Sequence, residues 1–213
     1  MIYLDYQATT PLAPEAREAM LPWLGGPDTS GAFGSSRLQA NGWANPHSPH
    51  RPGRAAAAAV EVAREQVASL LPPGGQVIFT SGATEAINLA IIGSGQNIAS
   101  RRLAVSAIEH AAVLDTARFV DPGCAVLPVD GAGLVARDVA IPDGTELVSV
   151  MQVNNEIGTV QPVVELAERA RAMGALFLCD AVQGAGKIAA PDGADLIAIS
   201  AHKLYGPKGV GAL

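Results

Sequence analysis

Long apolar runs and basic residues are scarce in this chain of 213 residues. No stretch approaches the ~20 apolar residues that a membrane-spanning helix requires, and the N-terminus lacks the basic start and apolar run of a secretory signal. The chain has 14 lysine and arginine residues against 20 aspartate and glutamate residues, a formal charge of −6. This acidity argues against binding to a nucleic-acid backbone, which needs a basic face. We therefore expect neither a membrane nor a nucleic acid as a partner.

Cysteine and the aromatic residues are also few. Cys124 and Cys179 are the two cysteines, and they are too few for a disulfide framework and lack metal-ligand spacing. This usage predicts a soluble protein of a reducing compartment, the cytoplasm. With 2 Trp, 3 Tyr and 4 Phe, the core must consist mainly of Ala, Val, Leu and Ile. His47 and His50 suggest a metal pair, but no further ligands accompany them, so we favour a proline-rich loop there and predict no metal site.

Short apolar runs alternate with helical periodicity along most of the chain. Apolar strands without polar alternation are covered on both faces, and helices between them favour parallel neighbours. The sequence therefore predicts an α/β fold with a mostly parallel sheet and flanking helices. The expected helices are 54–71, 85–92 and 163–173, and the expected strands are 77–80, 103–108, 125–129, 147–153, 176–179 and 196–199.

Residues 25–53 differ from the rest of the chain in composition. Glycine, serine, proline and asparagine dominate this stretch, and no hydrophobic period is sustained in it. We interpret it as one long loop, and a long loop in a compact domain is usually functional or mobile.

Polar residues follow the predicted strands, at the sheet edge where open α/β folds bind ligands. In 81–85, small residues join a strand to a helix start, where free backbone N–H groups suit a phosphate. Ser and Thr at such a point are more often helix caps alone. His110 follows the next strand, and a lone histidine there is more often a structural hydrogen-bonding residue than a catalyst.

Three further strand ends carry polar groups. Asn154 and Asn155 suit a ligand site or an ordinary turn, and Asp180 needs a donor or cationic partner if it is buried or else caps the next turn. Lys203 is one of only three lysines; a desolvated amine can serve as a Schiff-base nucleophile, although a solvated surface lysine is the commoner case. Taken together, these groups match the needs of pyridoxal phosphate: an amine for its aldehyde, a phosphate cradle, a carboxylate for the ring nitrogen, a planar group over the ring and amide donors for the phenolate oxygen.

The sequence resembles the pyridoxal-phosphate-dependent cysteine desulfurases of the class V aminotransferase family, nearest to the NifS/IscS-like branch. The Asn-Asn-Glu-Ile-Gly form at 154–158 and the Gly-Pro-Lys-Gly form at 206–209 favour this branch over the SufS-like one. The resemblance implies the aspartate-aminotransferase-like fold, fold type I: a large α/β domain, a smaller C-terminal domain and a dimer whose site uses both subunits. The matching stretches follow the family order along nearly the whole chain: 3–6, 8–11, 81–85, 109–110, 153–158, 180, 183 and 200–209.

Carried over residue by residue, the resemblance implies three catalytic residues. Lys203 would hold the cofactor covalently and move the proton at the substrate carbon. His110 would stack on the pyridine ring and assist acid–base steps, and Asp180 would keep the ring nitrogen protonated. Gln183 and Asn155 would donate to the phenolate oxygen, with Asn155 also near the substrate carboxylate. The residues implied for the phosphate are Ala83, Thr84, Ser200 and His202.

The resemblance also implies an activity and its partners. In the family, L-cysteine is converted to L-alanine, and a cysteine thiolate on a mobile loop takes the sulfur as a persulfide. The sulfur then passes to an iron–sulfur scaffold or another sulfur-accepting protein. We therefore expect L-cysteine as the substrate, a homodimer or hetero-oligomer as the assembly, and a sulfur-accepting protein as a partner.

The match to the family stops at Leu213, shortly after the lysine motif. The small C-terminal domain, the arginine for the substrate carboxylate and the persulfide cysteine have no counterpart, and neither Cys124 nor Cys179 matches the nucleophile position. We interpret residues 1–213 as a pyridoxal-phosphate-binding large domain and expect a C-terminal chain or segment to complete it. The stretch before 45–48 is also longer than the family pattern.

Two other functions stay open on the sequence. Another class V enzyme, such as a selenocysteine lyase or a small-substrate aminotransferase, shares the cofactor residues. A catalytically silent assembly subunit would retain the sheet without the chemistry. Cofactor absorbance separates the silent subunit from the two enzymes, and the release of sulfide and alanine from L-cysteine separates the enzymes from each other.

Overall fold

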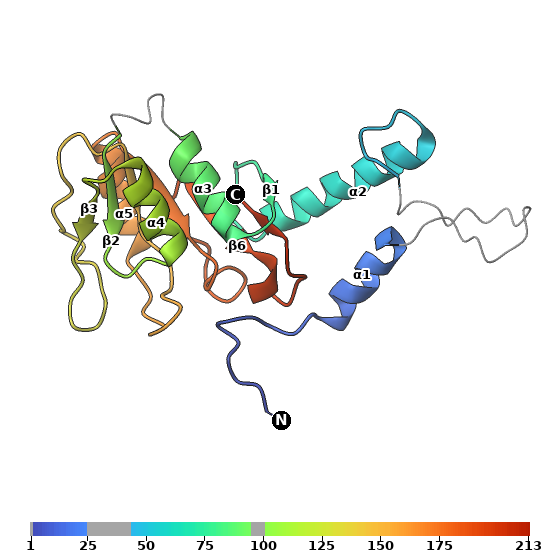
Figure 1. Ribbon diagram of the computed structural model, residues 1–213, viewed down its shortest axis with the longest axis horizontal. Helices are drawn as coiled ribbons and strands as arrows, with labels where there is room; N and C mark the ends of the chain where they lie inside the picture. The colour runs from blue at the N-terminus through green and yellow to red at the C-terminus, as the bar shows by residue number, and fades with distance from the viewer. Residues whose placement is uncertain (1, 25–43, 95–100) are drawn as a thin grey trace, which may run out of the picture.

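The computed structural model describes residues 2–24, 44–94 and 101–213 (Figure 1). The strands are β1 (Phe79–Thr80), β2 (Leu103–Ser106), β3 (Ala125–Leu127), β4 (Leu147–Ser149), β5 (Leu176–Asp180), β6 (Leu196–Ser200) and β7 (Gly211–Ala212). The helices are α1 (Pro14–Leu24), α2 (Arg51–Ala68), α3 (Ala83–Gly93), α4 (Ala111–Val120), α5 (Val163–Ala172) and the short 3-10 helix η2 (Ala201–Lys203).

In the described residues seven strands form one sheet in the order β1-β7-β6-β5-β4-β2-β3. Strands β6, β5, β4, β2 and β3 pair in parallel, whereas β7 is antiparallel to both β6 and β1. Every residue of β2 and β4 is buried, as expected for strands that are covered on both faces. The predicted α/β fold with a mostly parallel sheet is confirmed.

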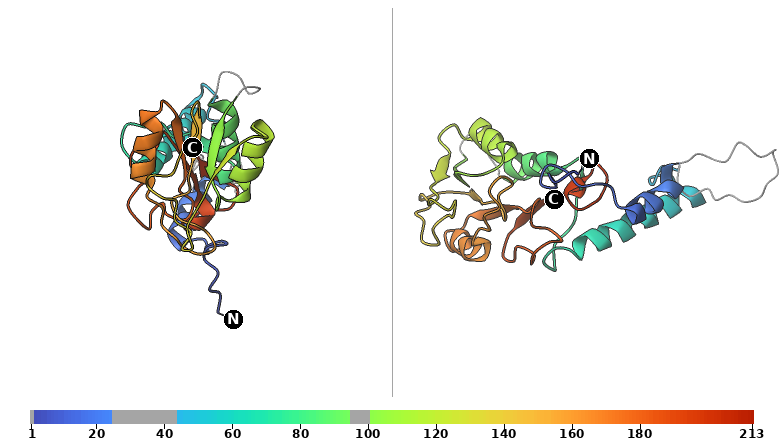
Figure 2. Two further views of the ribbon diagram at one scale, coloured as in Figure 1. Left: turned by 90° about the vertical axis from the view of Figure 1, so that its left-hand side faces the viewer. Right: turned by 90° about the horizontal axis from the view of Figure 1, so that it is seen from below.

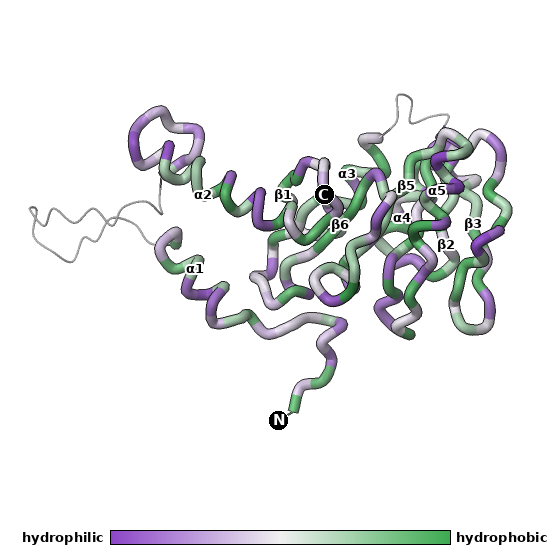
Figure 3. The backbone as a smooth tube through the Cα atoms, turned by 180° about the vertical axis from the view of Figure 1, so that it is seen from behind, coloured by the Kyte–Doolittle hydropathy of each residue, from purple (hydrophilic) through white to green (hydrophobic). Residues whose placement is uncertain are grey.

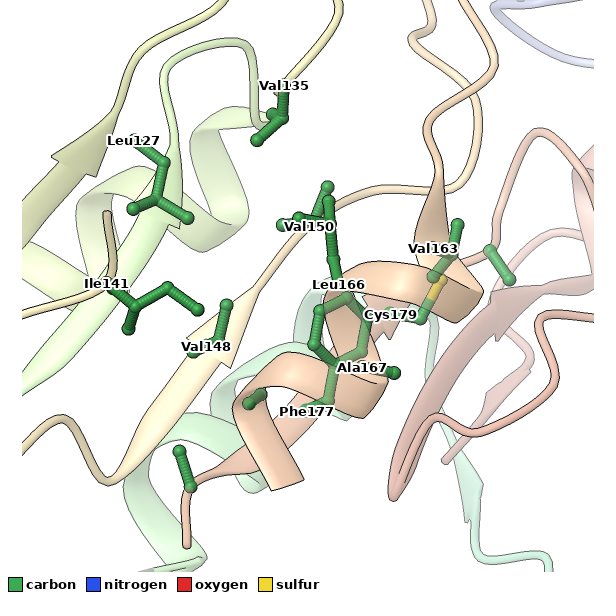
Figure 4. Packing of buried hydrophobic residues seen from close by; sticks show 14 of the residues in the cluster. Leu127, Val135, Ile141, Val148, Val150, Val163, Leu166, Ala167, Phe177 and Cys179 are labelled. Carbon is green, nitrogen blue, oxygen red and sulfur yellow. The ribbon is translucent and has the colours of Figure 1, made fainter. Parts of the chain in front are cut away.

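Helices cover both faces of the sheet. Figure 2 shows the sheet between α5 on one side and the pair α3 and α4 on the other. On the α5 face, Phe177 of β5 packs in one apolar cluster with Leu166 and Ala167 of α5, as Figure 4 shows. On the opposite face, Ile87 of α3 and Val113 of α4 belong to a second cluster. Ala, Val, Leu and Ile supply most of both clusters, as the composition predicts.

Helices α1 and α2 extend away from the sheet (Figure 1). None of the residues of α1 is buried against the rest of the described chain, and α2 buries only Gly53 and Ala56. Hydrophobic and hydrophilic residues alternate along α2 (Figure 3). In the parts of the chain that the structure describes, no helix has both the length and the apolar character needed to cross a membrane.

Several element bounds differ from the sequence-based expectation. Helix α2 begins at Arg51, so the prediction of a loop is wrong for 51–53, and the helix ends at Ala68 instead of residue 71. The start has two physical causes: a proline is tolerated in the first helical turn, and the His50 Nδ1 atom accepts a hydrogen bond from the Gly53 N–H at 3.1 Å. The predicted loop is confirmed for 44–50, and its part from 25 to 43 lies outside the described residues.

Four elements of the structure have no counterpart among the predicted ones: α1, α4, η2 and β7. Strand β7 has two residues, and it pairs on both sides, Ala212 with Phe79 and with Ile199. A two-residue strand leaves no periodic signal in a sequence. Its pairing is decided by the neighbouring strands.

We expect substitution of Phe177 by alanine to lower the free energy of unfolding by about 3–5 kcal/mol, because a fully buried ring leaves a cavity. Phe119→Ala is the matched control, since 79% of Phe119 is exposed whereas Phe177 is fully buried. The control should stay within about 0.5 kcal/mol of the unsubstituted chain. Urea unfolding followed by circular dichroism measures both, and equal losses in the two variants would contradict the described core.

Candidate active site

A cleft of about 860 Å³ lies where the carboxyl ends of β5 and β6 meet the N-termini of α3 and α4. This is the edge of an open α/β sheet at which ligands usually bind. The structure brings all nine of the predicted site residues to the lining of this one cleft: Ala83, Thr84, His110, Asn155, Asp180, Gln183, Ser200, His202 and Lys203.

The N-terminus of α3 opens into the cleft. Its N-cap residue is Gly82, and no side chain caps the helix there. The first N–H groups of a helix have no partner within it, so those of Ala83 and Thr84 are available to an anion, which the helix dipole favours. Gly211 of β7 packs closely against this turn, since a Cβ atom on Gly211 would lie 2.5 Å from the Gly82 carbonyl carbon. The close approach of β7 therefore fixes the turn.

His110 occupies the N-cap of α4, where its Nδ1 atom accepts a hydrogen bond from the Ala112 N–H at 3.1 Å. An accepting Nδ1 carries no proton, so in the neutral ring the proton is on Nε2. The ring is thereby held in one orientation at the cleft wall. The sequence left open whether His110 is structural or catalytic, and the geometry combines a structural cap with a position in the cleft.

Asp180 is the last residue of β5 and is only 5% exposed. Its Oδ1 atom accepts a hydrogen bond from the Val182 N–H at 3.0 Å. Burial raises the pKa of this carboxyl group, and the Val182 hydrogen bond, His110 and Lys203 act in the opposite direction. A buried carboxylate gains most from a cationic partner. Asp180 is therefore well placed to pair with a positively charged group of a ligand in the cleft.

Lys203 ends the short helix η2, which follows β6 directly. Its amine donates hydrogen bonds to the Gln7 carbonyl and, at 2.9 Å, to the Ala8 carbonyl. Burial lowers the pKa of the amine, Lys187 lowers it further, and Asp5 and Asp180 act in the opposite direction. A lowered pKa increases the uncharged, nucleophilic fraction of an amine.

The backbone around Lys203 is tightly constrained. Tyr205 has a φ angle of 59°, which is uncommon for a residue other than glycine. Its N–H donates to the Thr10 Oγ1 atom at 2.8 Å, and the Thr10 N–H donates to the His202 carbonyl at 2.8 Å. The N-terminal segment thus holds the turn that carries Lys203.

The same N-terminal segment forms a wall of the cleft that the sequence-based site did not include. Gln183 donates from its Nε2 atom to the Gln7 carbonyl at 2.9 Å, and the His202 Nδ1 atom lies 3.1 Å from the Thr9 Oγ1 atom. Residues 8–11 matched the family pattern, but nothing in the sequence indicated that they contact residues such as His202, about 190 positions later in the chain. Other lining residues without a predicted role are Asp5, Gln7, Ala8, Thr9, Ser81, Gly82, Glu85, Ile87, Ala112, Met151, Val182, Lys208 and Gly209.

The two adjacent asparagines, Asn154 and Asn155, have different roles: one stabilises the turn and the other lines the cleft. Asn154 is buried; its Oδ1 atom accepts from the N–H groups of Glu156 and Ile157, and its Nδ2 atom donates to the Ile108 carbonyl at 2.9 Å. Asn155 instead lines the cleft. Asn154 therefore builds the turn, as the simpler interpretation of the sequence had it, and Asn155 is presented by that turn.

The lining groups fit pyridoxal phosphate by their chemistry. The uncapped N-terminus of α3 and Ser200 suit a phosphate, buried Asp180 suits a protonated ring nitrogen, and the Lys203 amine suits an aldehyde. His202 is also at hand, although burial lowers the pKa of its ring, as do Lys203 and Lys208, which favours the neutral form. In the described residues no group of three or more His, Cys, Asp or Glu side chains is placed to hold a metal ion.

Neither cysteine belongs to this cleft. Cys179 is buried inside β5, and burial raises the pKa of its thiol well above the usual value. Burial, with Asp121 as a second cause, raises the pKa of the Cys124 thiol to about 11. A thiol with a raised pKa is a poor nucleophile at neutral pH.

Comparison with known proteins relates the whole described chain to one family. The family model described as aminotransferase class-V matches residues 2–213. The chain is 44% identical to the cysteine desulfurase IscS of Rickettsia akari over 225 aligned residues, which are 100% of this chain and 51% of that protein. It is 43% identical to a cysteine desulfurase of Mus musculus, again with 100% of this chain covered and 46% of that protein. The chain thus spans about half the length of the curated relatives it matches.

Solved structures agree with this relation. A structure described as SspA in complex with cysteine superimposes with a TM-score of 0.84 at 34% identity and covers 100% of this chain and 60% of its own. A NifS-like protein from Rickettsia africae gives a TM-score of 0.81 at 30% identity and covers 100% of this chain and 57% of its own. From the match over 2–213 and these shared structures, the chain belongs to the class V aminotransferase family, whose members are pyridoxal-phosphate-dependent enzymes.

Proposed function

We propose that this chain is the cofactor-binding part of a cysteine desulfurase, an enzyme that converts L-cysteine to L-alanine and transfers the sulfur to a thiol. One observation carries the proposal: a single cleft combines the Lys203 amine, the buried Asp180 carboxyl and the uncapped N-terminus of α3. The names of the relatives support the substrate, since they are cysteine desulfurases, and one structural neighbour is described with cysteine bound.

The position of each lining residue in the cleft determines its role in the proposed reaction. Pyridoxal phosphate, when bound, supplies an electron sink for bond breaking at the substrate's α carbon. Lys203 holds the aldehyde end and moves the proton at the substrate carbon, helped by its lowered pKa. His110 covers the ring face with an imidazole whose orientation the Ala112 N–H bond fixes, and Asp180 keeps the ring nitrogen protonated. The N–H groups at the start of α3 and the Ser200 and His202 side chains hold the phosphate, and Gln183 and Asn155 bind the phenolate oxygen.

The sulfur transfer balances without an outside oxidant. The bond between Cβ and sulfur of L-cysteine breaks, the sulfur joins an accepting thiol as a persulfide, and the carbon takes a proton to become the methyl group of L-alanine. The two thiols bring two hydrogens, of which one ends on the methyl group and one on the persulfide. Cys124 and Cys179 have raised pKa values, so we propose that the accepting thiol comes from outside these 213 residues.

The assembly of the protein, its partners and its location in the cell are part of this proposal. We propose a dimer or hetero-oligomer, completion of the site by a C-terminal segment or chain, and transfer of sulfur to an iron–sulfur scaffold or similar acceptor in the cytoplasm. The exposed apolar side chains of α1 support a partner surface, since Leu21 is 50%, Trp23 38% and Leu24 70% exposed.

Replacing Lys203 by arginine should abolish covalent capture of pyridoxal phosphate, because a guanidinium keeps the charge but offers no primary amine for the aldehyde. Lys187→Arg is the matched control, since Lys187 does not line the cleft. Visible absorbance and mass spectrometry after borohydride reduction measure capture. A cofactor that stays attached in Lys203→Arg would contradict the assignment. An unsubstituted chain that takes up no cofactor would favour a silent assembly subunit.

Replacing Asp180 by asparagine should leave cofactor capture intact and lower the rate of L-alanine formation by about 10- to 100-fold, because a neutral amide cannot stabilise the protonated ring nitrogen. The cofactor-loaded chain, together with the C-terminal segment or chain that completes the site, is incubated with L-cysteine and dithiothreitol as the accepting thiol, and L-alanine is quantified by chromatography. The control is Asp138→Asn, an exposed aspartate outside the cleft. An unchanged rate in Asp180→Asn would contradict the role. If L-selenocysteine is a substrate and L-cysteine is not, the enzyme is a selenocysteine lyase instead.

A further inference from the structure

Glu109 is a buried carboxyl group beside the cleft that the proposed mechanism does not use. It directly precedes His110 in the chain, is 6% exposed and is not part of the cleft lining. It lies in the connection between the end of β2 and the start of α4. A buried glutamate is unusual unless it is paired or hydrogen-bonded, so its contacts indicate what it does.

The contacts of Glu109 join the ends of two neighbouring strands. Its Oε1 atom accepts hydrogen bonds from the Ser106 Oγ atom at 2.5 Å and from the Met151 N–H at 2.7 Å. Ser106 ends β2, and Met151 follows β4 and lines the cleft. A second bond, from Asn154 to the Ile108 carbonyl, connects the same two segments. The positions of His110 and of residues 151–155 are therefore coupled through Glu109.

The surroundings of Glu109 favour its uncharged form. Both donors go to Oε1, whereas Oε2 has no hydrogen-bond partner among the described residues. Burial raises the pKa of Glu109 to about 8; the bonds from Ser106 and Met151 oppose this shift, and the Asp180 charge adds to it. At neutral pH the carboxyl is thus mostly protonated.

The other titratable groups around Glu109 come from two elements. Asp180 and Cys179 lie on β5, and the charges of Glu109 and Asp180 both raise the pKa of the Cys179 thiol. His110, at the start of α4, acts on Asp180, as Lys203 does. Strand β4 and the residues after it, 147–151, contribute no charged side chain. A protonated Glu109 leaves Asp180 as the carboxylate that faces the cofactor ring.

We propose that Glu109 is a positioning residue of this active site: its hydrogen bonds to Ser106 and Met151 set His110 and the 151–155 segment around the cofactor ring. The proposal rests on the proposed function for the cofactor, but the placement of His110 and the protonation of Glu109 are properties of the chain itself. Both are therefore measurable without cofactor and without turnover.

The test compares Glu109→Gln with Glu109→Ala. Glutamine is uncharged and keeps an oxygen that accepts both hydrogen bonds, whereas alanine removes the connection. The matched control is Glu168→Gln, which removes one charge from an exposed position on α5. The histidine ring signals are recorded by NMR, and His110→Gln assigns the His110 signals among those of the four histidines. Affinity for pyridoxal phosphate is measured by spectrophotometric titration.

We expect Glu109→Ala to shift the His110 ring signals and to weaken cofactor affinity about 10-fold or more, the effect of losing hydrogen bonds to a buried carboxyl. Glu109→Gln should keep the His110 ring signals at their positions in the unsubstituted chain and the cofactor affinity within about 3-fold of its value there. Unchanged His110 signals and affinity in Glu109→Ala would overturn the proposal. If the unsubstituted chain binds no cofactor, the proposed function fails, and the His110 signals alone decide on Glu109.

The pH dependence of unfolding tests the protonation. A carboxyl whose pKa rises from 4.5 to about 8 on folding binds an extra proton in the folded state between these values, so stability falls as pH rises through this window. The unfolding temperature of the unsubstituted chain and of Glu168→Gln should therefore decline from pH 5.5 to 8 more steeply than that of Glu109→Gln. Parallel curves for all three proteins would contradict an uncharged Glu109.

Discussion

The parallel hydrogen bonding of β4, β5 and β6 is the constraint on which the candidate active site depends. Ser149 pairs with Leu178, and Asp180 pairs with Ala198, so the three strands end at the same edge of the sheet. Residues from three distant parts of the chain, namely Met151, Asp180 and Lys203, reach one cleft for this reason. Because the strands are buried on both faces, a one-residue slip of the register would move every side chain to the opposite face and disrupt the packing of both apolar clusters, which keeps the arrangement in place.

Helix starts complete the site on one face of the sheet. Helices α3 and α4 pack against the same face, and both begin at the cleft. The first has no side-chain cap, which leaves its N–H groups for an anion, while the second is capped by His110. A difference of one side chain therefore leaves one helix start free for an anion and makes the other the support of an imidazole ring.

Charge in the cleft follows from burial. Burial is the largest cause that shifts Asp180 and Lys203 in the cleft, and Glu109 beside it, toward their uncharged forms. A ligand with a cationic nitrogen supplies the partner charge that the buried Asp180 carboxyl lacks, and an anionic phosphate on the same ligand suits the free N–H groups at the start of α3. This complementarity, more than the shape of the cleft, favours pyridoxal phosphate over a neutral ligand.

The sequence by itself determined the fold class, the order of the main elements and the residues at the strand ends. It could do so because apolar runs, breakers and polar residues just after a strand are local signals. It missed the helices α1 and α4, and it also missed β7 and η2, which are too short to show a period. It placed the start of α2 three residues late because a histidine cap and a first-turn proline gave no hydrophobic signal.

Only the tertiary structure decided how the groups of the cleft meet. The bonds of Lys203 and Gln183 to the N-terminal segment join residues more than 170 positions apart in the chain, and no local pattern contains such a pairing. The separate roles of Asn154 and Asn155, and the burial of Glu109 between two strand ends, likewise follow from packing. The residue types of a sequence show which chemical groups a chain contains. The distances between these groups and their desolvation arise only on folding, and they decide where the chemistry takes place.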